Sequence, residues 1–255
     1  MHRFYCPDTH FSKNSVTLNE KDEIHHLKNV LRLTTSDTLF LFNGTGGEAK
    51  GKVERITNQK IEIAILETSQ KSPLLPEITL ACAIPKKTKF EWIVEKCVEL
   101  GVSKVIPLET KRTQLNLSAS GKEKKLKRYR TVAVNAAKQS QQAFLPKIEP
   151  VTGYKEAIQN AAQNPGTILI PSLVGERKEL RAALEETKTE EQEGRDSNPG
   201  TLTIFIGPEG DFTPEEYQLA FEHKAVPVSL GETILKVETA AIASLSFIRL
   251  FFHQT

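Results

Sequence analysis

The stretch "TIFIGPEGDFTPEE", residues 203–216, runs from an apolar strand through a glycine-rich turn into the start of a helix. Residues 203–206 are all β-branched or aromatic, a composition typical of a strand that is buried on both faces. Thr213, Pro214 and Glu216 have the spacing of a capping box with proline at the first helical position. The turn at residues 207–211 is therefore predicted to lie at the carboxyl end of a strand, where open α/β sheets bind their ligands.

A second stretch, "SLGETILKVETAA" at residues 229–241, also leaves a strand, passes a glycine and enters a helix. Glycine at positions Gly207, Gly210 and Gly231 lets the main chain approach a ligand closely. Residues 233–235 add an apolar wall with exposed main chain, which suits a purine because its faces are apolar and its edge forms hydrogen bonds. Spacing alone leaves open the alternative that both stretches are ordinary strand–helix turns.

From residue 78 onward, strand patterns alternate with helix patterns, which predicts an α/β domain with a parallel sheet. The strands are expected at residues 78–84, 105–108, 167–173, 202–206 and 226–230, and the helices at 89–100, 122–142, 178–187, 214–223 and 237–252. Residues 1–72 have the short runs and the Asn-Gly turn of a small β-rich domain, and Pro73 and Pro76 mark a linker. The acidic segment 185–196 is predicted to be a surface loop.

The composition of the 255 residues, with 38% hydrophobic and 26% charged side chains and a net charge of +2, is ordinary for a soluble globular protein. The amino terminus lacks the apolar core of a signal peptide, and the most apolar stretch, residues 240–252, is too short to span a bilayer. We therefore expect a cytoplasmic location and no membrane contact. Cys6, Cys82 and Cys97 are far apart and the histidines lack ligand spacing, so neither a disulfide framework nor a metal site is expected.

Between residues 111 and 147 the chain carries a one-sided positive charge that Glu123 alone opposes. The basic residues of this segment are Lys111, Arg112, Lys122, Lys124, Lys125, Lys127, Arg128, Arg130, Lys138 and Lys147. A run this one-sided favours contact with a polyanion over a merely solvated helix face. Tyr129 within it either stacks on a base or belongs to the core. RNA is the favoured polyanion if the target base lies in an unstacked loop.

The two glycine stretches, "IGPEGDFTPEE" (206–216) and "LGETILKVETAA" (230–241), closely resemble the signature pair of the RsmE family. These are the 16S rRNA (uracil-N3)-methyltransferases of the SPOUT superfamily. The segments "HRFYC" (2–6), "HHLKNVLRL" (25–33) and "FNGTGGE" (42–48) look like the family's amino-terminal domain, and residues 86–112 look like the start of its catalytic domain. The resemblance covers nearly the whole chain.

This resemblance implies a fold and an activity. The implied fold is a small PUA-like β-barrel domain that binds RNA, residues 1–72, followed by a SPOUT α/β domain with a trefoil knot, residues 73–255. The implied enzyme is a homodimer that uses S-adenosylmethionine to methylate N3 of the uridine at position 1498 of 16S rRNA. By the same resemblance, an assembled or nearly assembled 30S subunit is the expected substrate.

The resemblance also implies roles for individual residues. Arg112, Lys236 and Glu238 are the expected catalytic residues: the cations would stabilise a uracil anion, while Glu238 would orient a cation, act as the base, or only favour the helix dipole. The expected cofactor contacts are Leu173, Gly207, Pro208, Glu209, Gly210, Leu230, Gly231, Ile234, Leu235 and Thr239. The expected RNA contacts are Arg3, Arg32, Arg128, Arg130 and Gln139.

Three positions depart from the family pattern. Lys236 stands where arginine is usual, Gln141-Gln142 where Gly-Arg is usual, and Gly210-Asp211 where Gly-Gly is frequent. Two alternatives to the implied activity stay open: a SPOUT methyltransferase that acts on another RNA position, and a non-catalytic RNA-binding protein of ribosome assembly. The identity of the general base is not determined by the sequence.

Overall fold

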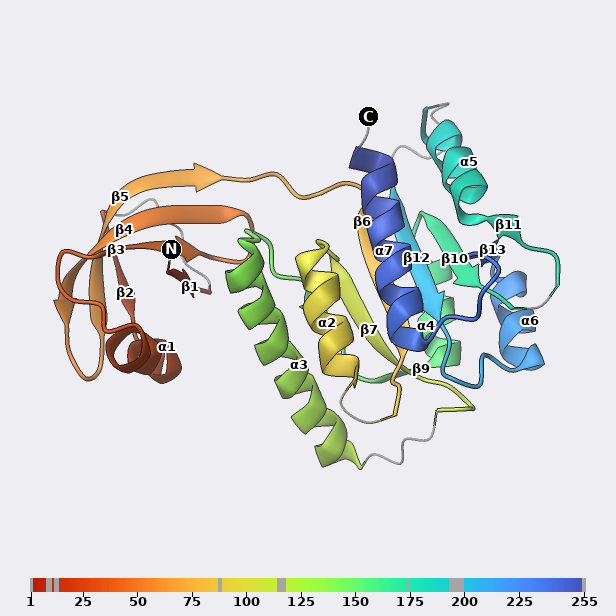
Figure 1. The fold of residues 1–255 in the computed structure, drawn as a ribbon, viewed down its shortest axis with the longest axis horizontal. Helices are drawn as coiled ribbons and strands as arrows, with labels where there is room; N and C mark the ends of the chain where they lie inside the picture. The colour runs from red at the N-terminus through yellow and green to blue at the C-terminus, as the bar shows by residue number, and fades with distance from the viewer. Residues whose placement is uncertain are drawn as a thin grey trace. The chain divides into compact units, whose positions relative to one another are not determined.

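The computed structural model describes residues 2–7, 11, 14–86, 89–113, 118–173, 175–192 and 200–253. The chain divides into two compact units. Unit 1 comprises Met1–Pro73 and Ala137–Leu145, and unit 2 comprises Leu74–Ala136 and Pro146–Thr255. Figure 1 shows the chain as a ribbon coloured from the amino to the carboxyl terminus.

Unit 1 is built on a five-stranded, mostly antiparallel sheet. Its strand order is β1 (Arg3–Tyr5), β3 (Thr38–Phe42), β4 (Gly47–Ile56), β5 (Ile61–Gln70) and β2 (Ser15–Leu18). The short helix α1 (Lys21–His25) continues into a π-helical turn, η1 (His26–Val30). Alternate residues of β4 and β5 point into one core, where Phe4, Leu27 and Ile63 are fully buried. The predicted small β-rich domain is confirmed in its strands.

A distant segment completes unit 1. Residues 137–145, at the end of helix α3 and just beyond it, bond to the turn that precedes β4. The Gly46 amide donates to the Ala143 carbonyl over 3.1 Å, and the Leu145 amide donates to the Gly44 carbonyl over 2.9 Å. This return could not be predicted from the sequence, because these bonds join residues about a hundred positions apart.

Unit 2 contains an eight-stranded sheet whose strand pairs, among the described residues, are all parallel. The order is β11 (Lys178–Glu179), β13 (Val226–Ser229), β10 (Thr167–Pro171), β12 (Thr201–Ile206), β6 (Glu77–Ala83), β7 (Lys104–Glu109) and β8 (Lys147–Ile148), and β9 (Thr152–Gly153) also pairs with β7. Strands β6 and β12 are buried along nearly their whole length, as expected for strands covered on both faces. The predicted parallel α/β sheet is confirmed.

Helices cover both faces of this sheet. They are α2 (Lys89–Glu99), α3 (Ala119–Ser140), α4 (Tyr154–Ala162), α5 (Leu180–Gln192), α6 (Pro214–Glu222) and α7 (Val237–His253). Helices α2 and α7 pack together on one face, and α4 and α6 pack together on the other (Figure 1). None of the helices in the described part of the chain is long and apolar enough to cross a membrane.

One element contradicts the prediction from sequence. The segment 185–196 was expected to be a surface loop, but α5 is helical as far as Gln192, and residues 193–196 lie outside the described residues. Leu180, Leu184 and Thr187 form a buried stripe on α5 at helical spacing. The acidic residues between them occupy the exposed face, so their charge did not exclude a helix.

The start of α6 is determined by its own sequence. Thr213 caps the helix: its hydroxyl accepts from the Glu216 amide, and the Glu216 carboxylate accepts from the Thr213 amide, which is the predicted capping box. The rings of Phe212 and Tyr217 meet edge to face on either side of the cap, 5.6 Å apart. This end of the loop after β12 is therefore rigidly placed.

Candidate cofactor and RNA sites

Three loops of unit 2 enclose a cavity of about 230 Å³. The loops follow β10, β12 and β13, which are neighbours in the parallel sheet, so their carboxyl ends meet at one edge. Residues of all three loops line the cavity, together with Val237 and Ala240 at the start of α7. The two glycine stretches singled out in the sequence therefore lie on opposite sides of one hollow.

The first glycine loop, residues 207–211, is held by internal hydrogen bonds. The Asp211 amide donates to the Pro208 carbonyl over 2.9 Å, which closes a turn. A Cβ atom at Gly207 would come within 3.3 Å of the Asp211 carboxylate and the Phe212 ring, a tight contact that favours glycine at this place. Arg112 adds hydrogen bonds from its guanidinium to the carbonyls of Gly210 and Phe212.

The second glycine loop, residues 230–236, is more open. Gly231 has φ +116°, a conformation that residues with a side chain rarely adopt, and a side chain there would meet nothing within 4 Å. The amides of residues 233–235 have no hydrogen-bond acceptor in the described part of the chain. Ile234 is 79% exposed. This loop thus offers an apolar surface and unpaired main-chain donors to a ligand.

Charged side chains that are not themselves among the lining residues lie next to the lining residues Glu209 and Val237 and form a rim on the α2 side. Lys89 donates to the Glu238 carboxylate over 2.7 Å, and the Lys86 amide donates to the Glu209 carboxylate over 3.2 Å. Burial disfavours the Glu238 carboxylate, but the Lys89 hydrogen bond and the charges of Lys89 and Lys236 outweigh it and lower the Glu238 pKa. Glu238 is therefore ionised, pairs with Lys89, and is a weak base.

Most of the residues expected to contact the cofactor line this cavity. They are Leu173, Gly207, Pro208, Glu209, Leu230, Gly231, Ile234 and Leu235. Gly210 and Thr239 are not among the lining residues: Gly210 contacts Arg112 on the outer side of its loop, and Thr239 is exposed on α7. Ser172, Arg177 and Glu232 also line the cavity but were not singled out in the sequence.

The three expected catalytic residues do not all lie together. Arg112 lies outside the cavity, in a neighbouring groove of about 760 Å³ that shares the wall residue Asp211 with it. Lys236 is exposed just before α7, and Glu238 lies in its first turn. Lys89, which pairs with Glu238, was not singled out in the sequence. One signal could have found it, because its helix follows β6, whose carboxyl end lies at the same edge of the sheet.

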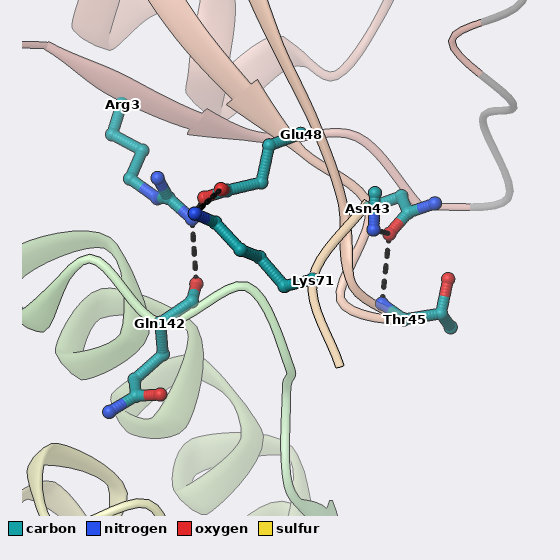
Figure 2. Close-up of polar contacts among 7 residues, drawn as sticks. Arg3, Asn43, Thr45, Glu48, Lys71 and Gln142 are labelled. Atoms are coloured by element: carbon teal, nitrogen blue, oxygen red, sulfur yellow. Dashed lines mark hydrogen bonds and ion pairs between the residues drawn. The ribbon is translucent and has the colours of Figure 1, made fainter. Parts of the chain in front are cut away.

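Arg3, an expected RNA contact, is occupied inside unit 1. Its guanidinium lies between Glu48 and the Gln142 carbonyl, at 2.6 Å and 2.8 Å, and it stacks on the Phe42 ring (Figure 2). The Arg3 side chain is only 9% exposed. This arrangement favours a structural role for Arg3, which links β4 to the returning segment 137–145.

The other expected RNA contacts are exposed. Arg32 and Gln139 lie on the surface of unit 1, and Arg128 and Arg130 lie on the exposed side of α3 in unit 2. Arg128 forms an ion pair with Glu91, 3.0 Å away. Tyr129, for which base stacking and a core role were both open, is buried and packs against Phe90 with the ring centroids 4.7 Å apart.

The basic segment 111–147 is less one-sided in the structure than in the sequence. Acidic residues from other elements pair with many of its cations: Glu215 with Lys111, Glu109 with Lys122, Glu91 with Arg128, Glu23 with Lys138, and Glu149 with Lys147. Among the described residues, the cations of this segment without an ion-pair partner are Arg112, Lys124, Lys125, Lys127 and Arg130, and all but Arg112 lie on α3.

The cysteines and the acidic residues show no metal-binding arrangement in the described residues. Cys6, Cys82 and Cys97 are free and buried. Burial, and to a lesser extent the nearby Glu23 carboxylate, raises the pKa of Cys6 to about 12. These thiols are part of the two cores.

Comparison with known proteins identifies the fold and the family. Residues 70–249 match the model of an RNA methyltransferase domain, and residues 18–66 match that of an RNA methyltransferase PUA domain. The chain belongs to the RsmE family of RNA methyltransferases. Both glycine loops lie within the residues that match the RNA methyltransferase domain, and the amino-terminal sheet is PUA-like.

Named relatives support the assignment of the chain to this family. The ribosomal RNA small subunit methyltransferase E of Bacillus subtilis is 28% identical, over 89% of this chain and 87% of the relative. The protein of the same name from Synechocystis is 30% identical, over 88% of this chain and 69% of the relative. The crystal structure of the Neisseria gonorrhoeae protein bound to S-adenosyl methionine has a TM-score of 0.82 at 28% identity and covers 98% of this chain and 97% of that one.

Proposed function

We propose that this RsmE-family chain transfers a methyl group from S-adenosylmethionine to N3 of the uridine at position 1498 in the 16S rRNA of the 30S subunit. The observation that carries the proposal is the cavity between the two signature loops. A relative of the same fold was crystallised with S-adenosyl methionine, which supports the same cofactor here.

The residues around the cavity fit this cofactor. Apolar side chains such as Pro208, Leu230 and Leu235 suit the faces of an adenine ring, and the unpaired amides of residues 233–235 suit its edge. Arg177 lines the cavity with its guanidinium near the Ser172 carbonyl, 3.1 Å away, and offers a cation to a carboxylate. When bound, the cofactor supplies an electrophilic methyl group on a sulfonium.

Methylation of a uracil at N3 requires that N3 lose its proton, since its lone pair forms the new bond to carbon. A cation near the ring favours the anion that remains. Lys89 pairs with Glu238 beside the cavity, the charge of Lys236 also acts on Glu238, and Arg112 lies in the adjoining groove. We assign these three side chains to anion stabilisation and target positioning. We assign Glu238 to holding the lysines, because its lowered pKa makes it a poor base.

The remaining features of the proposal follow the family resemblance. Unit 1 is proposed to bind RNA through exposed residues such as Arg32 and Gln139, and unit 2 through Arg128 and Arg130. The trefoil knot, the domain boundary at residues 72 and 73, and the homodimer stay predictions. Gln141 takes a left-handed φ of 60°, which glycine adopts readily, so the backbone at this position accounts for the glycine that is usual in the family.

Nucleoside mass spectrometry tests the proposal directly. Small subunits that lack the modification would be incubated with the protein and methyl-labelled S-adenosylmethionine. The expected result is label in 3-methyluridine at position 1498. Label in another nucleoside would favour the alternative of a different RNA target, and cofactor binding without any label would contradict the proposed substrate.

A matched pair of variants tests the cation at the rim. Lys89→Met and Lys96→Met each remove an ion-paired lysine from α2, but Lys96 pairs with Glu95 and Glu99 at the other end of that helix. Lys89→Met is expected to lower the rate constant of methyl transfer by about tenfold or more, and Lys96→Met to leave it nearly unchanged. Equal effects would remove Lys89 from the proposed site.

A further inference from the structure

Asp211 holds an unusual backbone conformation beside the cavity. Its φ is +62°, in the left-handed region, and it stands where the family frequently has glycine. One oxygen of its carboxylate accepts two hydrogen bonds of 2.8 Å, from the Phe212 amide and from the Tyr217 hydroxyl. The side chain that makes this conformation costly is thus also the one that stabilises it.

The Tyr217 hydroxyl lies where two of the cavity loops meet. Besides Asp211, it reaches the Pro171 carbonyl at the end of β10, 3.4 Å away. Burial raises the pKa of Tyr217, so the hydroxyl keeps its proton and acts as the donor. Asp211 and Pro171 both line the cavity, whereas Tyr217 is not among its lining residues.

We propose that Tyr217 is a positioning residue for the methyl donor and acts through Asp211. Its hydroxyl fixes the left-handed turn and thereby holds residues 207–211 against the end of β10 in the arrangement that binds the cofactor. A loop that is ordered before binding loses less conformational entropy on binding, so the hydrogen bond raises affinity without touching the ligand. This inference rests on the proposed function and deepens it.

Tyr154 provides a matched control for this hydroxyl. Its ring packs on Phe212 with centroids 4.9 Å apart, compared with 5.6 Å for Tyr217, and both rings are nearly fully buried. The Tyr154 hydroxyl donates to the Glu216 carbonyl over 2.8 Å, but it reaches neither cavity loop. Tyr154→Phe and Tyr217→Phe therefore remove equivalent groups that differ in their link to the cavity.

Calorimetric titration of the full chain with S-adenosylmethionine tests the proposal, with the thermal transition of the cofactor-free protein as a second readout. Tyr217→Phe is expected to raise the Kd about fivefold, because the hydrogen bond from the hydroxyl to Asp211 is lost. Tyr154→Phe is expected to leave the Kd unchanged. Both variants are expected to lower the transition temperature of the cofactor-free protein by a similar amount. A Kd for Tyr217→Phe equal to that of the unaltered protein would overturn the positioning role.

The variant Asp211→Gly tests whether the effect passes through Asp211. Glycine adopts a φ of +62° without strain and removes the acceptor. Adding Tyr217→Phe to Asp211→Gly is expected to raise the Kd no further, and an undiminished fivefold effect would overturn the Asp211 step. Unaltered protein that binds no S-adenosylmethionine would instead overturn the proposed function, so the two failures are distinguishable.

Discussion

The two glycine loops of the cavity both lead from a strand into a helix, but the hydrogen bonds that hold them differ. Residues 207–213 are held by a turn, by the capping box of α6, by the Tyr217 hydroxyl and by Arg112. Residues 230–236 have few internal hydrogen bonds, chiefly between Ser229 and Gly231, and they end at the Lys89–Glu238 ion pair. The first loop is thus shaped by the protein alone, whereas the second presents unpaired groups that a ligand can order.

The largest effect should come from the buried anchor of the first loop. The Glu216 carboxylate accepts from the amides of Lys111 and Thr213, both over 2.9 Å, and Glu216 is 6% exposed. Glu216→Ala is expected to lower the free energy of unfolding by about 3 kcal/mol, because two amides lose their acceptor. Urea unfolding measures this. A loss below about 1 kcal/mol would mean that the first loop is not held as described.

In the second loop the critical feature is one backbone conformation. Gly231→Ala is expected to cost about 1–2 kcal/mol of stability, because alanine at φ +116° is strained although space is available. Gly153→Ala is the control, since that glycine also has open space around it but an ordinary φ of −67°. Thermal unfolding of both variants separates strain from crowding. Equal losses would contradict the role given to the Gly231 conformation.

The Lys89–Glu238 ion pair at the end of the second loop should make the stability of the folded protein depend on pH. The Glu238 pKa is lowered in the folded protein, so its ionised form stabilises the fold above the unfolded pKa of about 4.3. This contribution is lost as the pH falls through the lowered folded pKa. The stability difference between the unaltered protein and Glu238→Gln should be at most about 1 kcal/mol at pH 7 and should shrink as the pH falls below about 4.

Thermal unfolding between pH 3 and pH 7 measures this difference, and added salt should reduce it. Glu216→Gln is the comparison, because Glu216 accepts from two backbone amides and forms no ion pair among the described residues. A salt-independent difference for Glu238→Gln would show that the second loop, like the first, depends on uncharged contacts.

The smallest change in stability should come from Ile234. Its side chain is 79% exposed, so Ile234→Ser is expected to change the free energy of unfolding by less than about 0.5 kcal/mol. The same change should weaken S-adenosylmethionine binding, because Ile234 lines the cavity. Urea unfolding at two protein concentrations checks the first statement. A larger, concentration-dependent loss would indicate that a second copy of the chain covers this side chain.

The local structure around the site was predictable from sequence. The strand at β12, the turn at residues 207–211 and the start of α6 depend on propensities and hydrogen bonds within a few residues, such as those of Thr213 and Glu216. The parallel sheet followed from the alternation of elements, and it brought the two glycine stretches to one edge. The segment resemblance identified the family, which the comparisons then confirmed.

Only the tertiary structure decided which charges are free and which residues share a site. Lys89 and Glu238 are 149 positions apart, and the acidic partners of the basic segment come from other elements. The link between Arg3 and Gln142 spans 139 positions and draws residues 137–145 into unit 1. Such contacts leave no periodicity in the sequence, because they depend on how separate elements pack. The sequence alone therefore determined the elements and the family, and the packing determined the charge environment of the site.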